Sequence, residues 1–282
     1  MAVTNYNIRS AAFRPESAES YELSILTGVD SFAYAIRDRA ANQLLAYHTS
    51  ELSAAERVDL PATILGRLQG DDLLERTNFG TTVLGWQTPR AALVPQDLYD
   101  DGHRREYLDQ LSLVSLEDAV QEEWHNELNA HLLYVTTGNS LNAITTTLRA
   151  VRTRHVAGGL LNAWGLRSRR LAEADVSICL RGKQLIIAAH RAGSLQFFNT
   201  YSFATAEDVL YYTLLAYEHC GLLPARAPLY VSGEILAESE LYRLLYTYVA
   251  EVRFSQYGAP PKLAPDLPAV PTHIYYDLLC LS

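Results

Sequence analysis

The sequence predicts an α/β protein built from two copies of a βββαβαβ unit, one of which is interrupted by an inserted α+β subdomain. Two three-strand meanders, at residues 21–52 and 174–203, match in length and order, and apolar residues alternate along their strands. A short apolar strand ending in glycine follows each meander, at residues 132–138 and 229–233. An offset of about 150 residues between the copies favours internal duplication, and the alternative is two unrelated α/β stretches with similar short strands.

The second half, residues 171–282, shows the repeated unit most clearly. Gly182 stands first in a two-residue turn, as a type II′ hairpin requires. Thr205 and Asp208 have the spacing of a capping box at a helix start, and Gly221 is typical of a helix end. The expected elements are strands at 176–180, 185–189 and 195–203, a helix from 205, a strand at 229–231, a helix at 238–248 and a strand at 251–254.

The first half, residues 1–170, contains a long segment without a counterpart in the second half. We predict that residues 53–128 are an inserted subdomain that replaces the first helix of the unit. Leu132–Gly138 then resumes the unit as its fourth strand, because its apolar run and final glycine resemble those of Leu229–Gly233. The elements expected after it are a helical stretch at 141–148, a strand at 151–155 and a helix at 157–170.

The C-terminal segment has a different composition. Five of the eleven prolines lie between Pro260 and Pro271, which predicts an extended strap with little regular structure. Residues 274–281 are then mostly apolar. We therefore expect the end of the chain to dock back onto the body.

Composition and charge narrow the class of protein. A chain of 282 residues with 49% hydrophobic residues can bury a large core. The net charge of −9 argues against a general nucleic-acid binder. No start typical of a secretory signal and no apolar run of about 20 residues is seen, so we expect no transmembrane segment. Three widely spaced cysteines suit a reduced, cytoplasmic protein, and no His or Cys spacing is typical of a metal site.

Five short motifs stand out, at residues 93–95, 199–203, 207–212, 246–248 and 273–278. Together they resemble a bacterial family of uncharacterised proteins with the actin-like ATPase (ribonuclease H-like) fold. This resemblance implies the duplicated fold and brings no assigned activity. The inserted subdomain is also similar in architecture to the actin-like proteins of pilus assembly and cell division, which act largely as scaffolds.

The resemblance also implies a place for a nucleotide, because actin-like ATPases hold Mg-ATP between their halves with two hairpin turns. The first turn here has Gly and Asp in the reverse of the usual order, and the second lacks an acid and carries two cations. Gly233 and Glu234 supply half of the Gly-Gly motif on the adenosine side. ATP and magnesium are thus candidate ligands, and the alternative is ordinary turns. The candidate nucleotide-binding residues are Gly28, Asp30, Ser31, Arg181, Gly182, Lys183, Gly233 and Glu234.

A second candidate site is rich in arginine. Residues 128–172 contain no acid and no lysine, so this stretch carries +6 and the remainder of the chain carries −15. Guanidinium groups suit bidentate contacts with carboxylates. We expect several of them to pair with acids of the inserted subdomain and the rest to face an anionic partner surface; the alternative is a solvated helix face. The arginines are Arg149, Arg152, Arg154, Arg167, Arg169 and Arg170.

Two functions of different classes follow. The first is a non-catalytic scaffold or assembly partner with an actin-like fold, for which we assign no catalytic residue. The second is a nucleotide-dependent enzyme, an ATPase or a small-molecule kinase, and nucleotide binding without turnover lies between them. The turn Thr27–Ser31 favours the enzyme, and the missing acid at Arg181–Gln184 favours the scaffold.

Overall fold

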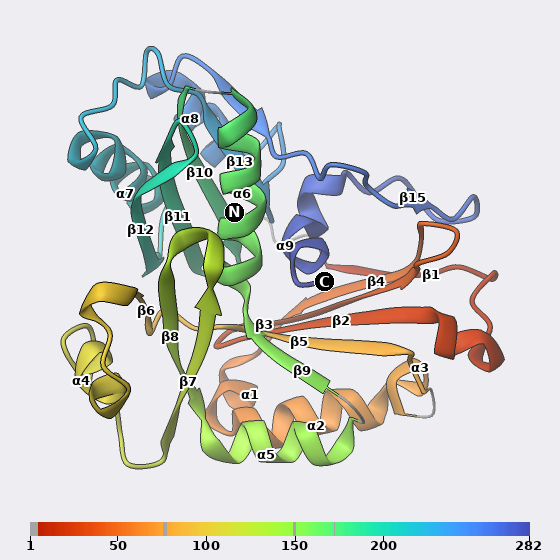
Figure 1. Ribbon diagram of the computed structural model, residues 1–282. Coiled ribbons are helices and arrows are strands. Elements are labelled where there is room, and N and C mark those ends of the chain that lie inside the picture. Colours follow the sequence, from red (N-terminus) through yellow and green to blue (C-terminus); the bar gives the residue numbers. More distant parts are fainter. Residues whose placement is uncertain (1–4, 76–77, 149–150, 172) are drawn as a thin grey trace.

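The computed structural model describes residues 5–75, 78–148, 151–171 and 173–282, which form two twisted sheets with helices packed around them (Figure 1). Each half of the chain supplies most of one of these sheets, and a smaller third sheet lies beside the second. Helix α6 (Val156–Leu171) follows the last strand of the first half and leads into the second. Its residues from Val156 to Leu161 are buried, so the connection is part of the core.

The second half forms the predicted βββαβαβ unit. β10, β11 and β12 are an antiparallel meander, and β13 and β14 continue the sheet in parallel from β10. Thr205 and Asp208 cap α7 reciprocally, as their spacing predicts. α7 and α8 pack together on one face of this sheet, and α6 covers the other (Figure 1). The bounds are β10 (Ala174–Arg181), β11 (Gln184–Arg191), β12 (Ser194–Ser202), α7 (Ala206–His219), β13 (Leu229–Gly233), α8 (Glu240–Tyr248) and β14 (Val252–Phe254).

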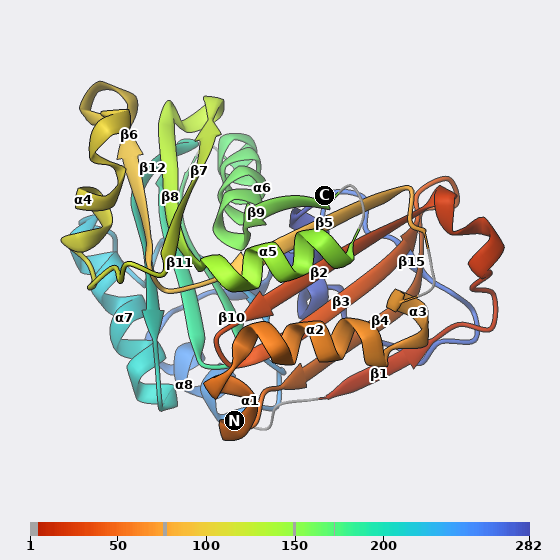
Figure 2. The same cartoon turned by 90° about the horizontal axis from the view of Figure 1, so that it is seen from below.

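The first half repeats this topology. Its strand order β4-β3-β2-β5-β9 matches β12-β11-β10-β13-β14, with the same antiparallel and parallel pairings. α2 and α5 lie side by side across one face of the first sheet (Figure 2). The duplicated fold class is therefore confirmed. The bounds are β2 (Tyr21–Gly28), β3 (Ser31–Asp38), β4 (Gln43–Glu51), α1 (Ala54–Val58), α2 (Leu60–Gly70), α3 (Asp72–Glu75), β5 (Thr81–Gln87), α5 (Gly138–Thr147) and β9 (Val151–His155).

The prediction for the fourth strand of the first half was wrong. β5 is that strand, since it pairs in parallel with β2, whereas residues 132–137 lie in the third sheet. The helices α1, α2 and α3 thus belong to the repeated unit, and the insertion lies between β5 and α5 rather than over 53–128. Apolar strands that precede a helix look alike in sequence, and only their pairing separates them.

The inserted subdomain is an antiparallel sheet of order β6-β8-β7 with α4 against it. It has a small core of its own, to which Leu108, Leu133 and Val135 contribute. Its elements are β6 (Ala91–Pro95), α4 (Arg104–Asp109), β7 (Asp118–His125) and β8 (Ala130–Thr137), with short 3₁₀ turns at Gln96–Leu98, Asp101–His103 and Asn126–Leu128. The division of the whole chain into halves at residues 170 and 171 stays a prediction.

The C-terminal segment docks back onto the body, as its apolar sequence predicts. A 3₁₀ turn (Thr272–Tyr275) leads into α9 (Tyr276–Cys280), and Ile274–Leu281 are all buried. α9 contacts α6, β2 and β13, so it lies between the two main sheets (Figure 1). The proline-rich strap also adds β15 (Lys262–Leu263) along β4, whose next neighbour is β3. Two N-terminal elements remain, β1 (Tyr6–Arg9), which pairs with β4, and a 3₁₀ turn at Pro15–Ser20.

None of the helices in the described part of the chain is both long enough and apolar enough to span a lipid bilayer.

Candidate functional site between the two halves

The two hairpin turns that the sequence singles out meet between the halves. The β2–β3 turn holds Asp30, which is 6% exposed, and the β10–β11 turn holds Gly182 and Lys183. The Asp30 Oδ2 atom accepts a hydrogen bond of 2.7 Å from the Lys183 backbone N–H. Gly182 has a φ of +56°, and a Cβ at this position would overlap the Asp30 carboxylate. Only glycine therefore lets the turns approach this closely.

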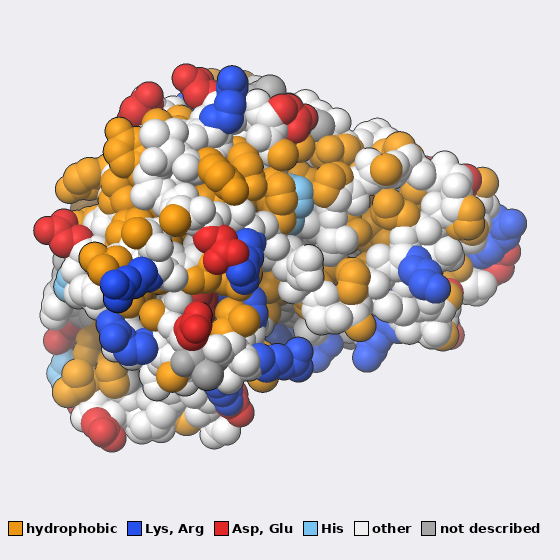
Figure 3. Space-filling view, turned by 90° about the horizontal axis from the view of Figure 1, so that it is seen from above, with side chains coloured by type: hydrophobic (Ala, Val, Ile, Leu, Met, Phe, Trp, Pro, Cys, Tyr) orange, Lys and Arg blue, Asp and Glu red, His pale blue; other side chains and the backbone are white. Residues whose placement is uncertain are grey.

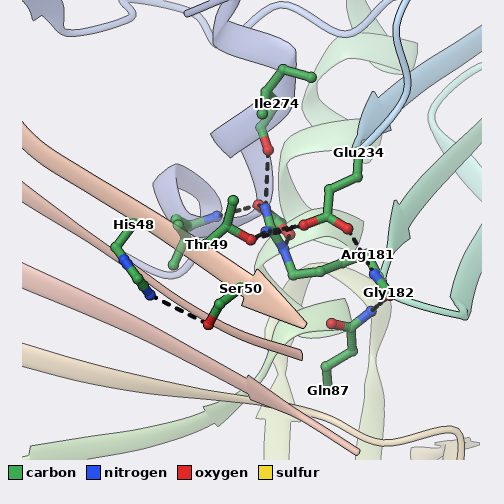
Figure 4. Close-up of polar contacts among 10 residues, drawn as sticks. His48, Thr49, Ser50, Gln87, Arg181, Gly182, Glu234 and Ile274 are labelled. Atoms are coloured by element: carbon green, nitrogen blue, oxygen red, sulfur yellow. Dashed lines mark hydrogen bonds and ion pairs between the residues drawn. The ribbon is translucent and has the colours of Figure 1, made fainter. Parts of the chain in front are cut away.

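Glu234 approaches the same turn from the end of β13. Its Oε2 atom accepts from the Gly182 N–H at 2.9 Å, and its Oε1 atom accepts from Thr49 Oγ1 at 2.9 Å (Figure 4). Gly233 makes this possible because its φ is +82° and a Cβ would overlap the Leu180 carbonyl oxygen. Two consecutive backbone N–H groups of the second turn are thus each bound by a carboxylate.

Arg181 is fully buried at the centre of the cluster. Its Nε and Nη2 atoms donate to the two oxygens of Asp277 on α9 at 2.6 and 2.9 Å, a bidentate ion pair. The remaining donors reach the Ile274 carbonyl at 3.0 Å, and Thr49 Oγ1 and Glu234 Oε1 at 3.1 Å each (Figure 4). All five guanidinium donors are satisfied. Burial opposes the charge, but Asp277 and its neighbours raise the pKa of Arg181 well above its ordinary value.

The first turn is less well satisfied. Four buried oxygen atoms around it have no hydrogen-bond partner among the described residues: Thr27 Oγ1, Asp30 Oδ1, Ser31 Oγ and Gln87 Oε1. A Cβ on Gly28 would lie 2.8 Å from Ser31 Oγ and 3.5 Å from Gln87 Oε1, so these groups surround the glycine. Burial raises the pKa of Asp30 despite the bond from Lys183. Such oxygens can accept hydrogen bonds from water or contact a cation.

Mg-ATP does not fit this arrangement. In the arrangement that the sequence resemblance implies, a phosphate would bind the N–H groups of the second turn, but the carboxylates of Asp30 and Glu234 hold them. It would also meet the negative charges of those side chains at short range, which is repulsive in a buried site. Arg181 is shared between Asp277 and Glu234, so its single positive charge is already used by these two carboxylates. Among the described residues, no group of three His, Cys, Asp or Glu is placed to hold a metal.

The eight predicted nucleotide-site residues therefore lie together, and their role in binding nucleotide stays a prediction. Sequence reasoning missed three partners, Thr49, Gln87 and Asp277. Asp277 carried a signal, because it is the one acid in the apolar run 274–281. Thr49 and Gln87 carried none, since a polar residue near a strand end is common in any sheet.

The predicted arginines are more dispersed, and Arg149 lies outside the described residues. Arg169 pairs with Glu127 of the insertion at 2.6 Å, as expected for this group. Arg167 instead pairs with Asp175 at 2.6 Å and stacks over Tyr230. The acids of the insertion mostly have other partners, which are Arg90 for Asp118, and His131 for Glu122. Arg152 and Arg170 are exposed, and Arg154 is partly buried.

Two solved structures have a similar fold. A crystal structure from Bacteroides thetaiotaomicron VPI-5482, described as a protein with actin-like ATPase fold and unknown function, has a TM-score of 0.77 at 15% identity, over 87% of this chain and 94% of that one. A PilM–PilN type IV pilus biogenesis complex gives 0.59 at 11% identity, over 92% and 97%. At these identities the likeness establishes the actin-like fold alone.

A comparison with curated proteins gives no match. A family model described as "Protein of unknown function (DUF3822)" matches residues 10–252, which is most of the sequence. The matched range contains both hairpin turns, the insertion and Glu234, and it ends before the strap and α9. The chain therefore belongs to the DUF3822 family of proteins of unknown function and has the actin-like ATPase fold.

Proposed function

We propose that this protein is a non-catalytic, cytoplasmic scaffold or assembly partner. The observation that carries the proposal is the pair of hydrogen bonds from the Gly182 and Lys183 N–H groups to Glu234 and Asp30. In this arrangement the chain's own carboxylates stand where a nucleotide phosphate would bind. The site then serves to join the halves, and the fold serves as a rigid body for protein contacts.

Two further observations support a protein partner. PilM, a structural neighbour of the same fold, forms a complex with PilN, as the name of that structure states. The exposed Arg152 and Arg170, with the partly buried Arg154, leave positive charge on a chain that is acidic overall. An acidic partner surface would complement them.

The alternative is an ATP-dependent enzyme, and one observation favours it. The four unpartnered oxygens at the first turn, which include those of Asp30 and Ser31, are of the type that binds magnesium and its waters. For this alternative to hold, the two carboxylates must leave the second turn when nucleotide arrives.

Phosphate release from ATP separates the two functions. With magnesium and excess ATP we expect no release above the background of buffer, and no rise of the melting temperature. Nucleotide at 100 times its Kd would stabilise the folded state by about 2.7 kcal/mol, so binding would be visible. Turnover that Asp30→Ala abolishes would make the protein an enzyme and end the scaffold proposal. Turnover that survives Asp30→Ala and Glu234→Ala would belong to a contaminant.

A further inference from the structure

A groove runs along one side of α6. Two adjoining cavities of about 410 and 620 Å³ form it, and both are open to solvent. One wall is a face of α6, and the other is formed by the segment that follows β14 and by α9. The residues that line both cavities are Arg167, Arg170, Gln256, Tyr257 and Gly258.

The wall formed by α6 has helical periodicity. The lining residues of α6 are spaced by three or four positions, so they share one face of the helix. They include Gly159, Asn162, Ala163, Leu166 and Arg170. Leu166 is 53% exposed on that face. The groove therefore combines an apolar strip with guanidinium groups along its length, and it extends for much of a helix whose 16 residues span about 24 Å.

The groove carries a surplus of positive charge. Arg154, Arg167, Arg170 and Arg253 line it, and no Asp or Glu appears among the described residues of either lining. Asp175 and Glu251 neutralise Arg167 and Arg253. Arg154 and Arg170 form no ion pair with any residue that the structure describes, so about two charges remain for a ligand. Figure 3 views the molecule from above and shows Lys and Arg side chains interspersed with Asp, Glu and hydrophobic side chains.

We propose that this groove binds an extended acidic segment of a partner protein. An extended chain advances about 3.3 Å per residue, so a segment of about seven residues would span the length of α6. Its carboxylates would pair with Arg154 and Arg170, and a central apolar side chain would cover Leu166. Elongation and charge complementarity select this occupant over a compact ligand. The inference rests on the proposed scaffold function, because it names the chemistry of the partner.

The test uses fluorescence anisotropy of a fluorescein-labelled peptide, Glu-Glu-Leu-Glu-Leu-Glu-Glu, with the whole protein. We expect saturable binding that weakens as salt rises, and no binding of the counterpart in which lysine replaces glutamate. Arg154→Glu/Arg170→Glu should weaken binding at least about tenfold. The matched control is Arg226→Glu/Arg243→Glu, which makes the same change of charge at exposed residues that do not line the groove and should bind as the wild type does.

Several outcomes would overturn the inference. Equal binding of the lysine peptide, or equal loss in both double variants, would remove the groove as the site. Displacement of the peptide by low concentrations of inorganic pyrophosphate would assign the groove to a small anion. Self-association that sedimentation detects, and that Arg154→Glu/Arg170→Glu abolishes, would assign it to a second copy. If the double variant does not fold, Arg170→Glu alone carries the test, since Arg170 is exposed.

The two proposals fail separately. ATP turnover that depends on Asp30, with peptide binding intact, would contradict the scaffold proposal and support the proposal that the groove binds an acidic segment. Absence of both peptide binding and ATP turnover would contradict the groove as a binding site, and the scaffold proposal would stand.

Discussion

At the residue scale, His155 is a buried polar side chain whose two ring nitrogens both form hydrogen bonds. Its ring is fully buried, its Nε2–H donates to the Thr88 carbonyl oxygen at 3.1 Å, and its Nδ1 accepts from the Ala157 N–H at 3.2 Å. Only the neutral imidazole with its proton on Nε2 makes both bonds. Burial lowers the pKa of His155 to about 4. The folded state thus keeps this histidine neutral where the unfolded chain would protonate it.

This shift predicts a pH dependence of stability. The unfolded histidine takes up a proton near pH 6.5, whereas the folded one does so only near pH 4. The free energy of unfolding should therefore fall as the pH drops from about 6.5 to about 4, by an order of 3 kcal/mol for this residue. Urea unfolding across this range should show a smaller loss for His155→Gln than for the wild type. The matched control is His219→Gln, which should not change the slope, because His219 is exposed and has no ion pair among the described residues. An unchanged slope in His155→Gln would contradict the assignment.

At the element scale, local patterns predicted most strands and helices, and failed where only long-range pairing decides. The capping residues Thr205 and Asp208 and the turn at Gly182 act through neighbours in sequence, so the chain reveals them directly. The choice between β5 and β8 as the fourth strand depends on which of them pairs with β2. Both lie far from β2 in the sequence, so no local pattern reveals the pairing. For the same reason Asp30 could be proposed as a site residue, but its bond to the Lys183 N–H could not.

The packing of α9 on α6 depends on one glycine. A Cβ on Gly159 would overlap the Cys280 carbonyl oxygen, so the two helices meet backbone to backbone at this point. We expect Gly159→Ala to lower the free energy of unfolding by about 1–3 kcal/mol, because α9 must shift. Gly66→Ala is the control, since no atom lies within 4 Å of its added Cβ in α2, and it should stabilise by up to about 1 kcal/mol. Urea denaturation measures both, and a gain in stability for Gly159→Ala would refute this account.

At the scale of the whole molecule, the duplicated halves share one hydrophobic core. A single cluster of buried residues includes Leu26 and Val83 of the first sheet, Ile186 of the second, and Leu278 of α9. The buried pair of Arg181 and Asp277 ties the second sheet to the same helix. The second half also has a separate cluster against α7 and α8. The fold thus joins its repeats through the C-terminal segment that the sequence marks by its apolar composition.

This shared core predicts that the halves unfold together. Neither half can unfold alone without exposing the apolar side chains of the shared cluster and separating Arg181 from Asp277. Breaking a buried ion pair costs about 3–5 kcal/mol. We expect one calorimetric transition, with the fluorescence of the buried Trp86 and Trp164 changing at the same temperature as the far-ultraviolet circular dichroism. Arg181→Ala should lower that temperature without dividing the transition. Two separate transitions in the wild type, with the tryptophan signal following only one, would show that α9 does not couple the halves.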